Sequence, residues 1–424
     1  MAIQPARRGE PGRHLHLTGR PGGPAARIVA RPEAQVPSEV DPLFAVAVRA
    51  FLLDVGILGT SVGVYIWLMI QANYLYDRIQ TPLTGAALVI LALLIYPVSN
   101  LKIGTASVDS LARSGAPYDA LHTLSDAGVG TGVLTPIVVL VDPDQADAAA
   151  DAAREVDGIQ LAAVSSDDAD YAVIQVVPVE ETVDSSSNEV VDAVRTTVEG
   201  AVDGEVLVTG AGATVEDYFT AVYDKFPYVL ALIALITFVL LMRTFRSILL
   251  PIKAVVLNLV SLAAVFGAVV FFWQEGHGSD LIFNVSATGA ITFWLPVVIF
   301  AFLFGLSMDY EVFILARMRE EYDESGDTEE AVITGLGRTG RLVTSAALIL
   351  FFAFAALASA PGTDIKVLGT ALGVGILIDA TVVRALLVPA LVTLLGRWNW
   401  WLPGWAAKVL RVEPSPLAPR QPVD

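Results

Sequence analysis

Long apolar runs dominate the chain from residue 82 to residue 395. A helix needs about 20 consecutive, mainly apolar residues to cross the hydrocarbon core of a bilayer. Six runs approach or exceed that length, and the last five are joined by short polar connections. We expect membrane spans at 82–98, 227–244, 251–273, 290–316, 341–360 and 366–395. The pattern therefore predicts an α-helical membrane bundle.

Residues 100–226 follow a different pattern, in which the apolar period changes several times. The order of predicted elements is β-α-β-β-α-β, which is typical of the split ferredoxin-like unit. The expected strands are 135–142, 160–166, 170–179 and 205–210, and the expected helices are 143–156 and 186–199. We therefore predict an α+β domain inserted between the first of these spans and the other five.

The net charge of −18 is concentrated in the same inserted segment. Residues 101–226 contain 23 acidic and 5 basic residues, a difference that equals the net charge of the whole chain. Such a surface repels nucleic acid and anionic head groups. The charge pattern therefore excludes nucleic acid as a partner.

Composition agrees with an integral membrane protein. Apolar residues make up 54% of the chain and charged residues 17%, with a mean hydropathy of +0.63, against about 45–50% and about 25% in soluble domains. The chain has no cysteine, which excludes thiol catalysis, iron–sulfur clusters and disulfides. No catalytic triad or carboxylate pair can be assembled, so we expect no enzyme activity, no cofactor and no metal site.

Basic residues gather in alternate connections between the spans, which predicts the orientation of the bundle. The connections at 275–280 and 361–366 contain one lysine between them. Lysine and arginine favour the cytoplasmic side, so we expect the acidic domain outside and the C-terminus inside. The basic residues are Arg243, Arg246, Lys253, Arg317, Arg319, Arg338, Arg341, Arg397, Lys408 and Arg411.

The N-terminal region is less regular. Residues 1–42 are rich in Arg, Pro and Gly without an apolar core, which predicts a disordered tail and not a secretory signal. The hydrophobic segment 43–76 is interrupted by Arg49 and Asp54. It either crosses the membrane, giving seven spans, or lies along the surface. We favour the second alternative, since a span would place the Arg-rich tail outside.

Asp309 and Tyr310 are the strongest candidates for chemistry. A carboxylate within a long apolar helix is costly and marks an ion pathway, a proton relay or a buried pair. Gly305 lies one turn earlier on the same helical face, where a neighbouring helix can approach closely. The alternative is that Asp309 lies at the cytoplasmic end of the helix, beside Glu311, and meets water.

Asp379 is a second carboxylate inside an apolar run. Arg384 lies in the same run and can offset its charge, so the alternatives are transport and an ion pair that fixes helix packing. We also expect Pro296 and Pro389 to kink their helices. The sequence 335–340 matches G-x-G-x-x-G, but it lacks the preceding strand of a dinucleotide site, which argues against nucleotide binding.

Several motifs in the region from about residue 247 to 403 resemble the MMPL family (mycobacterial membrane protein large), a branch of the RND transporters. They are FGLSMDYEVFILARMREEYDESGD (304–327), GLGRTGRLVTSAALI (335–349), ILIDATVVRALLVPAL (376–391) and LLGRWNWWLP (394–403). The preceding domain resembles the second extracytoplasmic domain of the family more loosely. The resemblance extends over about 80–403 and corresponds to the C-terminal half of a full-length member.

The resemblance implies a porter-type domain above a helix bundle, and proton-motive-force-driven export of lipids or other hydrophobic molecules. It assigns Asp309 and Tyr310 to a proton relay, and Gly305 and Ser307 belong to the same motif. Asp379 also matches a family motif position. The domains expected from these observations are the span 80–99, the acidic domain 100–226, the five-helix bundle 227–396 and the cytoplasmic tail 397–424.

Family members are usually two tandem halves, and the relay uses a second Asp-Tyr pair from the first half. No such pair occurs in 43–98. The resemblance therefore implies a half-size transporter that pairs with another copy or with a separate first-half chain. The alternative function is a non-transporting membrane scaffold or transporter remnant that binds lipid or a partner protein.

Overall fold

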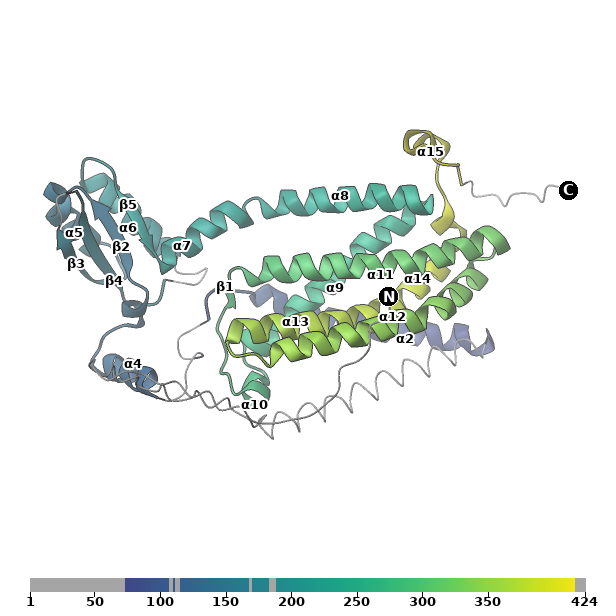
Figure 1. Ribbon diagram of the computed structural model, residues 1–424, viewed down its shortest axis with the longest axis horizontal. Coiled ribbons are helices and arrows are strands. Elements are labelled where there is room, and N and C mark those ends of the chain that lie inside the picture. Colours follow the sequence, from purple (N-terminus) through teal and green to yellow (C-terminus); the bar gives the residue numbers. More distant parts are fainter. Residues whose placement is uncertain (1–72, 107–109, 111–114, 168–169, 183–187, 416–424) are drawn as a thin grey trace, which may run out of the picture. The chain divides into compact units, whose positions relative to one another are not determined.

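The computed structural model describes residues 73–106, 110, 115–167, 170–182 and 188–415. The expected tail at 1–42 and most of the hydrophobic segment at 43–76 lie outside these residues. Figure 1 shows a small α/β domain and a set of long helices. Their order along the chain is helix, α/β domain, helices, as the periodicity predicted.

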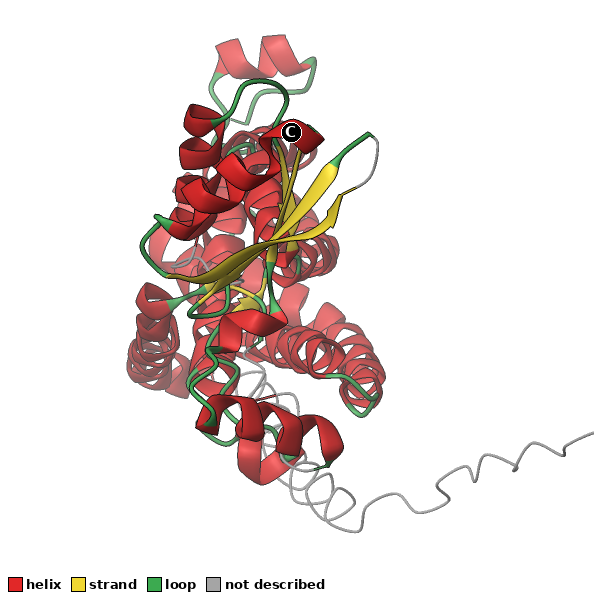
Figure 2. Ribbon diagram, turned by 90° about the vertical axis from the view of Figure 1, so that its left-hand side faces the viewer, coloured by secondary structure: helices red, strands yellow, loops and turns green. Residues whose placement is uncertain are grey.

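The α/β domain contains a four-stranded antiparallel sheet in the order β3-β4-β2-β5. In β2, alternate residues are fully buried, so one face of the sheet carries the core. Helices α5 and α6 pack on that core through small and branched side chains (Figure 2). The elements are β2 (Ile137–Val141), α5 (Ala146–Arg154), β3 (Ile159–Asp167), β4 (Ala172–Pro178), α6 (Asn188–Ala201) and β5 (Leu207–Gly210).

Five helices in the described part of the chain are long and apolar enough to cross a membrane. A sixth apolar stretch, Thr84–Asn100, is shorter and ends in a 3₁₀ turn that contains Pro97. The shorter stretch includes the end of α2 (Asn73–Ile95). The long helices contain α8 (Phe226–Phe245), α9 (Leu249–Val269), α11 (Leu295–Ser325) and α12 (Thr328–Ala358), and the last one contains both α13 (Thr363–Ile378) and α14 (Val388–Leu395). A π-helical segment, Asp379–Leu387, joins α13 to α14.

The predicted starts of two spans, at residues 290 and 341, were wrong. The span expected at 290–316 begins only at Leu295, since Ile291–Thr292 forms the short strand β6, which pairs in parallel with β1 (Ile103–Gly104). Pro296 lies in the first turn of α11, where a proline has no helical hydrogen bond to lose. Pro389 lies inside a continuous helical stretch, directly after the π-helical segment and at the second residue of α14. The expected kinks at the two prolines stay predictions.

The glycine-rich sequence 335–340 is helical and not a loop. Helix α12 starts earlier than predicted because the Asp327 carboxylate caps it, accepting hydrogen bonds from the N–H groups of Glu329 and Glu330. A Cβ at Gly335 would lie 2.9 Å from the backbone nitrogen of Met318. This glycine therefore allows α11 and α12 to pack closely.

Another close approach joins α2 to α9. A Cβ on Gly267 would lie 1.7 Å from the carbonyl oxygen of Leu94, so only glycine fits there without movement. The core of the bundle is otherwise aliphatic and aromatic, with Trp273 and Trp400 among its largest buried side chains.

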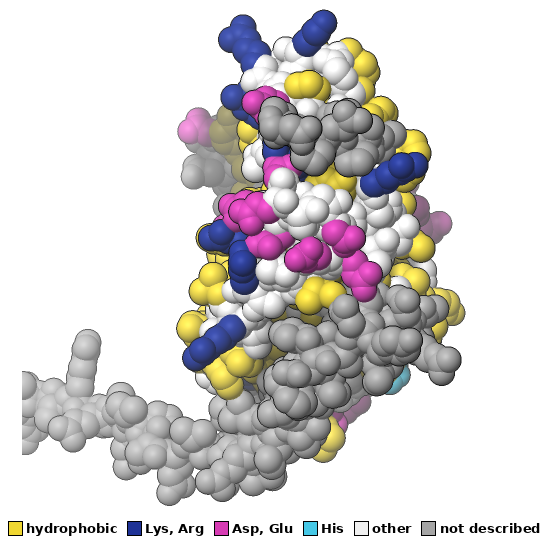
Figure 3. All heavy atoms as spheres, turned by 90° about the vertical axis from the view of Figure 1, so that its right-hand side faces the viewer, with side chains coloured by type: hydrophobic (Ala, Val, Ile, Leu, Met, Phe, Trp, Pro, Cys, Tyr) yellow, Lys and Arg dark blue, Asp and Glu magenta, His cyan; other side chains and the backbone are white. Residues whose placement is uncertain are grey.

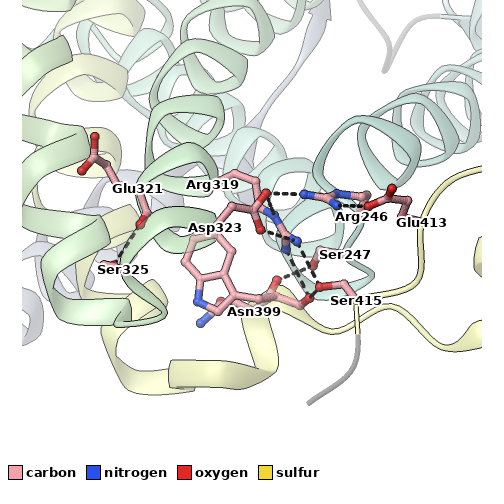
Figure 4. A network of polar contacts seen from close by, with 10 residues as sticks. Arg246, Ser247, Arg319, Glu321, Asp323, Ser325, Asn399, Glu413 and Ser415 are labelled. Atoms are coloured by element: carbon pink, nitrogen blue, oxygen red, sulfur yellow. Dashed lines mark hydrogen bonds and ion pairs between the residues drawn. The ribbon is translucent and has the colours of Figure 1, made fainter. Parts of the chain in front are cut away.

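Hydrogen bonds connect the segment after α14 to α11 (Figure 4). The Arg319 guanidinium donates to the carbonyl oxygen of Trp400 at 3.3 Å and to the hydroxyl of Ser415 at 3.0 Å, and it pairs with Asp323. Arg246, from the α8–α9 connection, pairs with the same Asp323. Charged side chains of both signs gather at this end of the bundle (Figure 3).

Candidate functional site

Asp379 lies among the buried residues where α13 passes into the π-helical segment. The Ser307 hydroxyl, from α11, donates to its Oδ1 at 2.9 Å, and Arg384 Nε donates to its Oδ2 at 2.6 Å. The predicted pairing of Asp379 with Arg384 is confirmed. In an α-helix, residues five apart point in different directions, whereas the wider turn of a π-helix brings them onto one face.

Arg384 connects three parts of the site. Besides Asp379, it donates to the carbonyl oxygen of Ser307 and, at 3.0 Å, to the Ser307 hydroxyl. Its guanidinium carbon lies 5.4 Å from the centre of the Tyr310 ring, within the range of a cation–π contact. Its Nη1 is buried without a hydrogen-bond partner in the structure. A buried donor of this kind usually binds an ordered water.

A small cavity adjoins this site. It has a volume of about 20 Å³ and is lined by Ser307, Tyr310, Asp379 and Arg384, together with Asn258 and Ser261 from α9. A cavity of about 10–15 Å³ or more with polar walls can hold one water. The site thus offers a carboxylate, a hydroxyl, a phenol and room for a proton-carrying water.

Asp309 and Gly305 lie on the opposite side of α11 from this site. Both residues are exposed on the bundle, and a Cβ on Gly305 would meet no atom within 4 Å. Asp309 has no hydrogen bond or ion pair with any of the described residues. Phe302 and Phe313, 49% and 56% exposed, follow the same stripe. The structure therefore separates Asp309 from Tyr310, which faces Arg384.

Two further ionisable residues, Lys253 and Glu311, line one cavity inside the bundle, and the sequence did not mark them as a site. Glu311 on α11 is 5% exposed, and Lys253 on α9 donates to the amide oxygen of Asn399. Both line a cavity of about 10 Å³. Lys253 falls inside the span expected at 251–273, but its charge was counted with the basic residues of the preceding connection. The spacing of Glu311 four residues after Ser307 was the available signal, since it puts both on one helical face.

A sequence model of the MMPL family matches residues 130–417. The chain is 34% identical over 343 residues to the mycolic acid-containing lipids exporter MmpL11 of Mycolicibacterium smegmatis, covering 77% of this chain and 35% of that protein. It is 33% identical over 339 residues to membrane protein YdfJ of Bacillus subtilis, covering 77% and 46%.

The chain is also 37% identical over 205 residues to the trehalose monomycolate exporter MmpL3 of M. smegmatis, covering 48% of this chain and 20% of the exporter. It thus spans less than half the length of these relatives, and the matches correspond to their C-terminal part. With five apolar helices of spanning length, this is a multi-pass membrane protein. The chain belongs to the MMPL family.

Proposed function

We propose that this chain takes part in proton-driven export of lipids or other hydrophobic compounds across the cytoplasmic membrane. The observation that carries the proposal is the buried Asp379–Arg384–Ser307 site beside Tyr310. Ionisable residues within spans are expensive, and their usual roles are proton relays and ion pathways. Two relatives from M. smegmatis are named as the mycolic acid-containing lipids exporter MmpL11 and the trehalose monomycolate exporter MmpL3, and these names support the substrate class.

In this proposal Asp309 and Tyr310 form the relay, while Gly305, Ser307 and Asp379 support it. Protonation of Asp309 from the outside removes a charge from the protein interior of the assembled transporter and permits the helices to repack. A proton that crosses the membrane supplies about 2.3 kcal/mol per 100 mV. The gradient is the energy source, so the mechanism needs no cofactor.

The exposed stripe of α11 is the proposed contact with a second bundle. A carboxylate facing hydrocarbon is costly, whereas one facing another helix can be paired. Gly305 leaves room for close helix approach on this stripe. We propose that a second copy, or a separate chain resembling the first half of the family, covers Asp309 and supplies the second Asp-Tyr pair.

The α/β domain is, in this proposal, the porter-type extracytoplasmic domain. Its strand order β3-β4-β2-β5 agrees with a ferredoxin-like topology, in which each crossover helix connects strands that are not adjacent. The basic residues that gather in alternate connections support a cytoplasmic C-terminus by the positive-inside rule. Protonation inside the bundle then moves a domain that contacts substrate outside.

The test is replacement of Asp309 by Asn, which keeps the shape of the side chain but cannot titrate. Uptake of a fluorescent acyl lipid into inverted membrane vesicles should fall to the level seen with an uncoupler. Glu324→Gln, which removes an exposed charge from the same helix, should leave uptake unchanged. Normal uptake by the Asp309→Asn protein, at equal abundance in the membrane, would refute the relay assignment.

A second function, that of a non-transporting scaffold or remnant, is favoured by one observation. Asp309 has no partner among the described residues, and an unpaired carboxylate cannot exchange a proton with a second relay group. Crosslinking in membranes separates the two functions. A dimer or larger assembly with crosslinks at the α11 stripe supports transport, whereas a monomer supports the scaffold.

A further inference from the structure

Helix α15 (Gly404–Leu410) lies beside the end of α8, shortly after the chain leaves its last long helix (Figure 1). Two buried alanines of α15 form a small apolar cluster with Met242 of α8 and Ile248 of the α8–α9 connection. The guanidinium of Arg243, in the last turn of α8, donates to the carbonyl oxygen of Leu410. These contacts hold α15 at the level of the helix ends, where a spanning bundle meets the membrane surface.

The side of α15 that faces away from this cluster has an exposed apolar stripe. Trp405 and Val409 lie four residues apart, so they share one face of the helix, and they are 70% and 75% exposed. Trp398, in the 3₁₀ turn before α15, is 49% exposed. Tryptophan concentrates at membrane–water interfaces because its ring is apolar and its N–H is polar. This composition fits the head-group region of a bilayer better than bulk water.

Basic residues accompany the apolar stripe. Arg397, Lys408 and Arg411 are exposed, and none of them has an ion pair with any residue that the structure describes. The next acidic residue in the sequence, Glu413, pairs with Arg246 at 3.5 Å. The segment therefore has an excess of positive charge, which attracts anionic head groups at a membrane surface.

An anionic bilayer surface fits this segment better than a protein partner does. A stable protein interface buries about 800 Å² on each side around an apolar centre that is depleted of charge. Helix α15 has only seven residues, a length of about 10 Å, and its exposed side combines apolar and basic residues. That combination suits a bilayer, because acyl chains surround the apolar side chains while phosphates attract the basic ones.

We propose that Trp405, Val409, Lys408 and Arg411 form a docking surface for anionic phospholipid of the surrounding bilayer. The two apolar side chains lie among the first carbons of the acyl chains, and the two basic residues attract the phosphates. This lipid is a constituent of the membrane and not a transported molecule. The inference therefore goes beyond the proposed export function and does not depend on it.

The first test measures lipid selectivity with the full chain in vesicles of phosphatidylcholine and phosphatidylglycerol. One lipid or the other carries a photoactivatable diazirine at the head-group end of an acyl chain. The phosphatidylglycerol probe should label peptides from residues 397–413 several-fold more than the phosphatidylcholine probe does, since only phosphatidylglycerol has a net negative charge. Equal labelling by the two probes would overturn the proposal.

Removal of the basic charges tests which residues attract the lipid. Lys408→Gln combined with Arg411→Gln should lower the phosphatidylglycerol labelling by about fivefold or more, because one basic residue near an anionic surface strengthens binding about fivefold. Arg317→Gln removes an exposed basic residue of α11 that pairs with Glu320, and it should leave the labelling unchanged. Unchanged labelling of the double variant would overturn the assignment of these two basic residues.

Tryptophan fluorescence tests where the apolar stripe lies. Comparison with the Trp405→Phe protein isolates the emission of this residue among the seven tryptophans of the chain. That emission should be quenched by phosphatidylglycerol brominated near the head-group end of its chains, and it should be shielded from iodide in the water. Quenching by iodide and not by the brominated lipid would overturn the proposal. Photocrosslinks from a probe placed at residue 405 to a second copy, or to residues 1–72 or 416–424, would overturn it as well.

Discussion

The α/β domain and the helix bundle each contain an Asp–Arg pair within one helical segment, in contrasting environments. Asp151 and Arg154 lie three residues apart on α5, with side chains 74% and 47% exposed. Asp379 and Arg384 lie five residues apart in the π-helical segment, 13% and 3% exposed. Water solvates the first pair, whereas the second depends on its protein partners for compensation of charge.

The difference in exposure between the two ion pairs separates charges that water solvates from charges that the protein itself must compensate. Acidic residues of the domain such as Asp151, Asp192 and Asp217 are exposed to water, so many of them can be accommodated. In the bundle, Asp379 has two hydrogen-bond donors and Arg384 has three acceptor atoms. Asp309 stands apart, since it is exposed on the apolar helix α11 and has no hydrogen bond or ion pair with any of the described residues. That contrast is the physical reason for proposing that another bundle covers it.

The largest expected effect is that of Asp379→Asn, which keeps the size of the side chain and removes its charge. Arg384 would be left as an uncompensated buried cation, and breaking a buried pair costs about 3–5 kcal/mol of unfolding free energy. Thermal unfolding of the purified full chain in detergent measures this loss. Adding Arg384→Met to the same protein should recover part of it, because the double variant has no unpaired charge. A single variant as stable as the parent would contradict the buried pair.

Much of the fold was accessible from the sequence, because the signals are local. Apolar runs of spanning length identified the helices, and short apolar segments around Val139 and Ile174 identified two of the strands. Pairing of Asp379 with Arg384 was one of the two alternatives that the sequence left open, because both residues lie in the same apolar run, and the structure shows this pair.

Other features depend on tertiary geometry and had no local signal. A π-helical turn has no composition of its own, so the bonds of Arg384 to Ser307 could not be derived. Neighbouring residues such as Asp309 and Tyr310 point about 100° apart on a helix, and the sequence did not reveal which of the two faces the bundle. Lys253 was counted with the basic connection although it lies inside α9, because it is only two residues from the start of the predicted span at 251–273 and helix ends are the least certain part of such predictions.

An intermediate effect is expected where helices touch through glycine. Gly267→Ala places a Cβ 1.7 Å from the Leu94 carbonyl oxygen, and overpacking of this kind costs about 1–3 kcal/mol. Gly305→Ala meets no atom in this chain and gains up to about 1 kcal/mol in helix propensity. The two variants should therefore shift the unfolding temperature in opposite directions.

If Gly305→Ala also weakens crosslinking between bundles, that glycine belongs to the contact with the proposed partner. Destabilisation by both variants to the same extent would contradict the open face of α11.

The smallest effect completes the comparison of the two ion pairs. Asp151→Asn in α5 breaks an exposed pair, and such pairs contribute about 0–1 kcal/mol. Its effect on unfolding should also shrink as salt is raised, because exposed charges are screened over about 8–10 Å at physiological ionic strength. The loss in Asp379→Asn should change little over the same range, since salt does not enter the bundle. Parallel unfolding of both proteins in low and high salt makes the measurement, with the parent chain as reference. Equal salt dependence of the two losses would mean that Asp379 is solvated, and the argument for a protected proton site in the bundle would then fail.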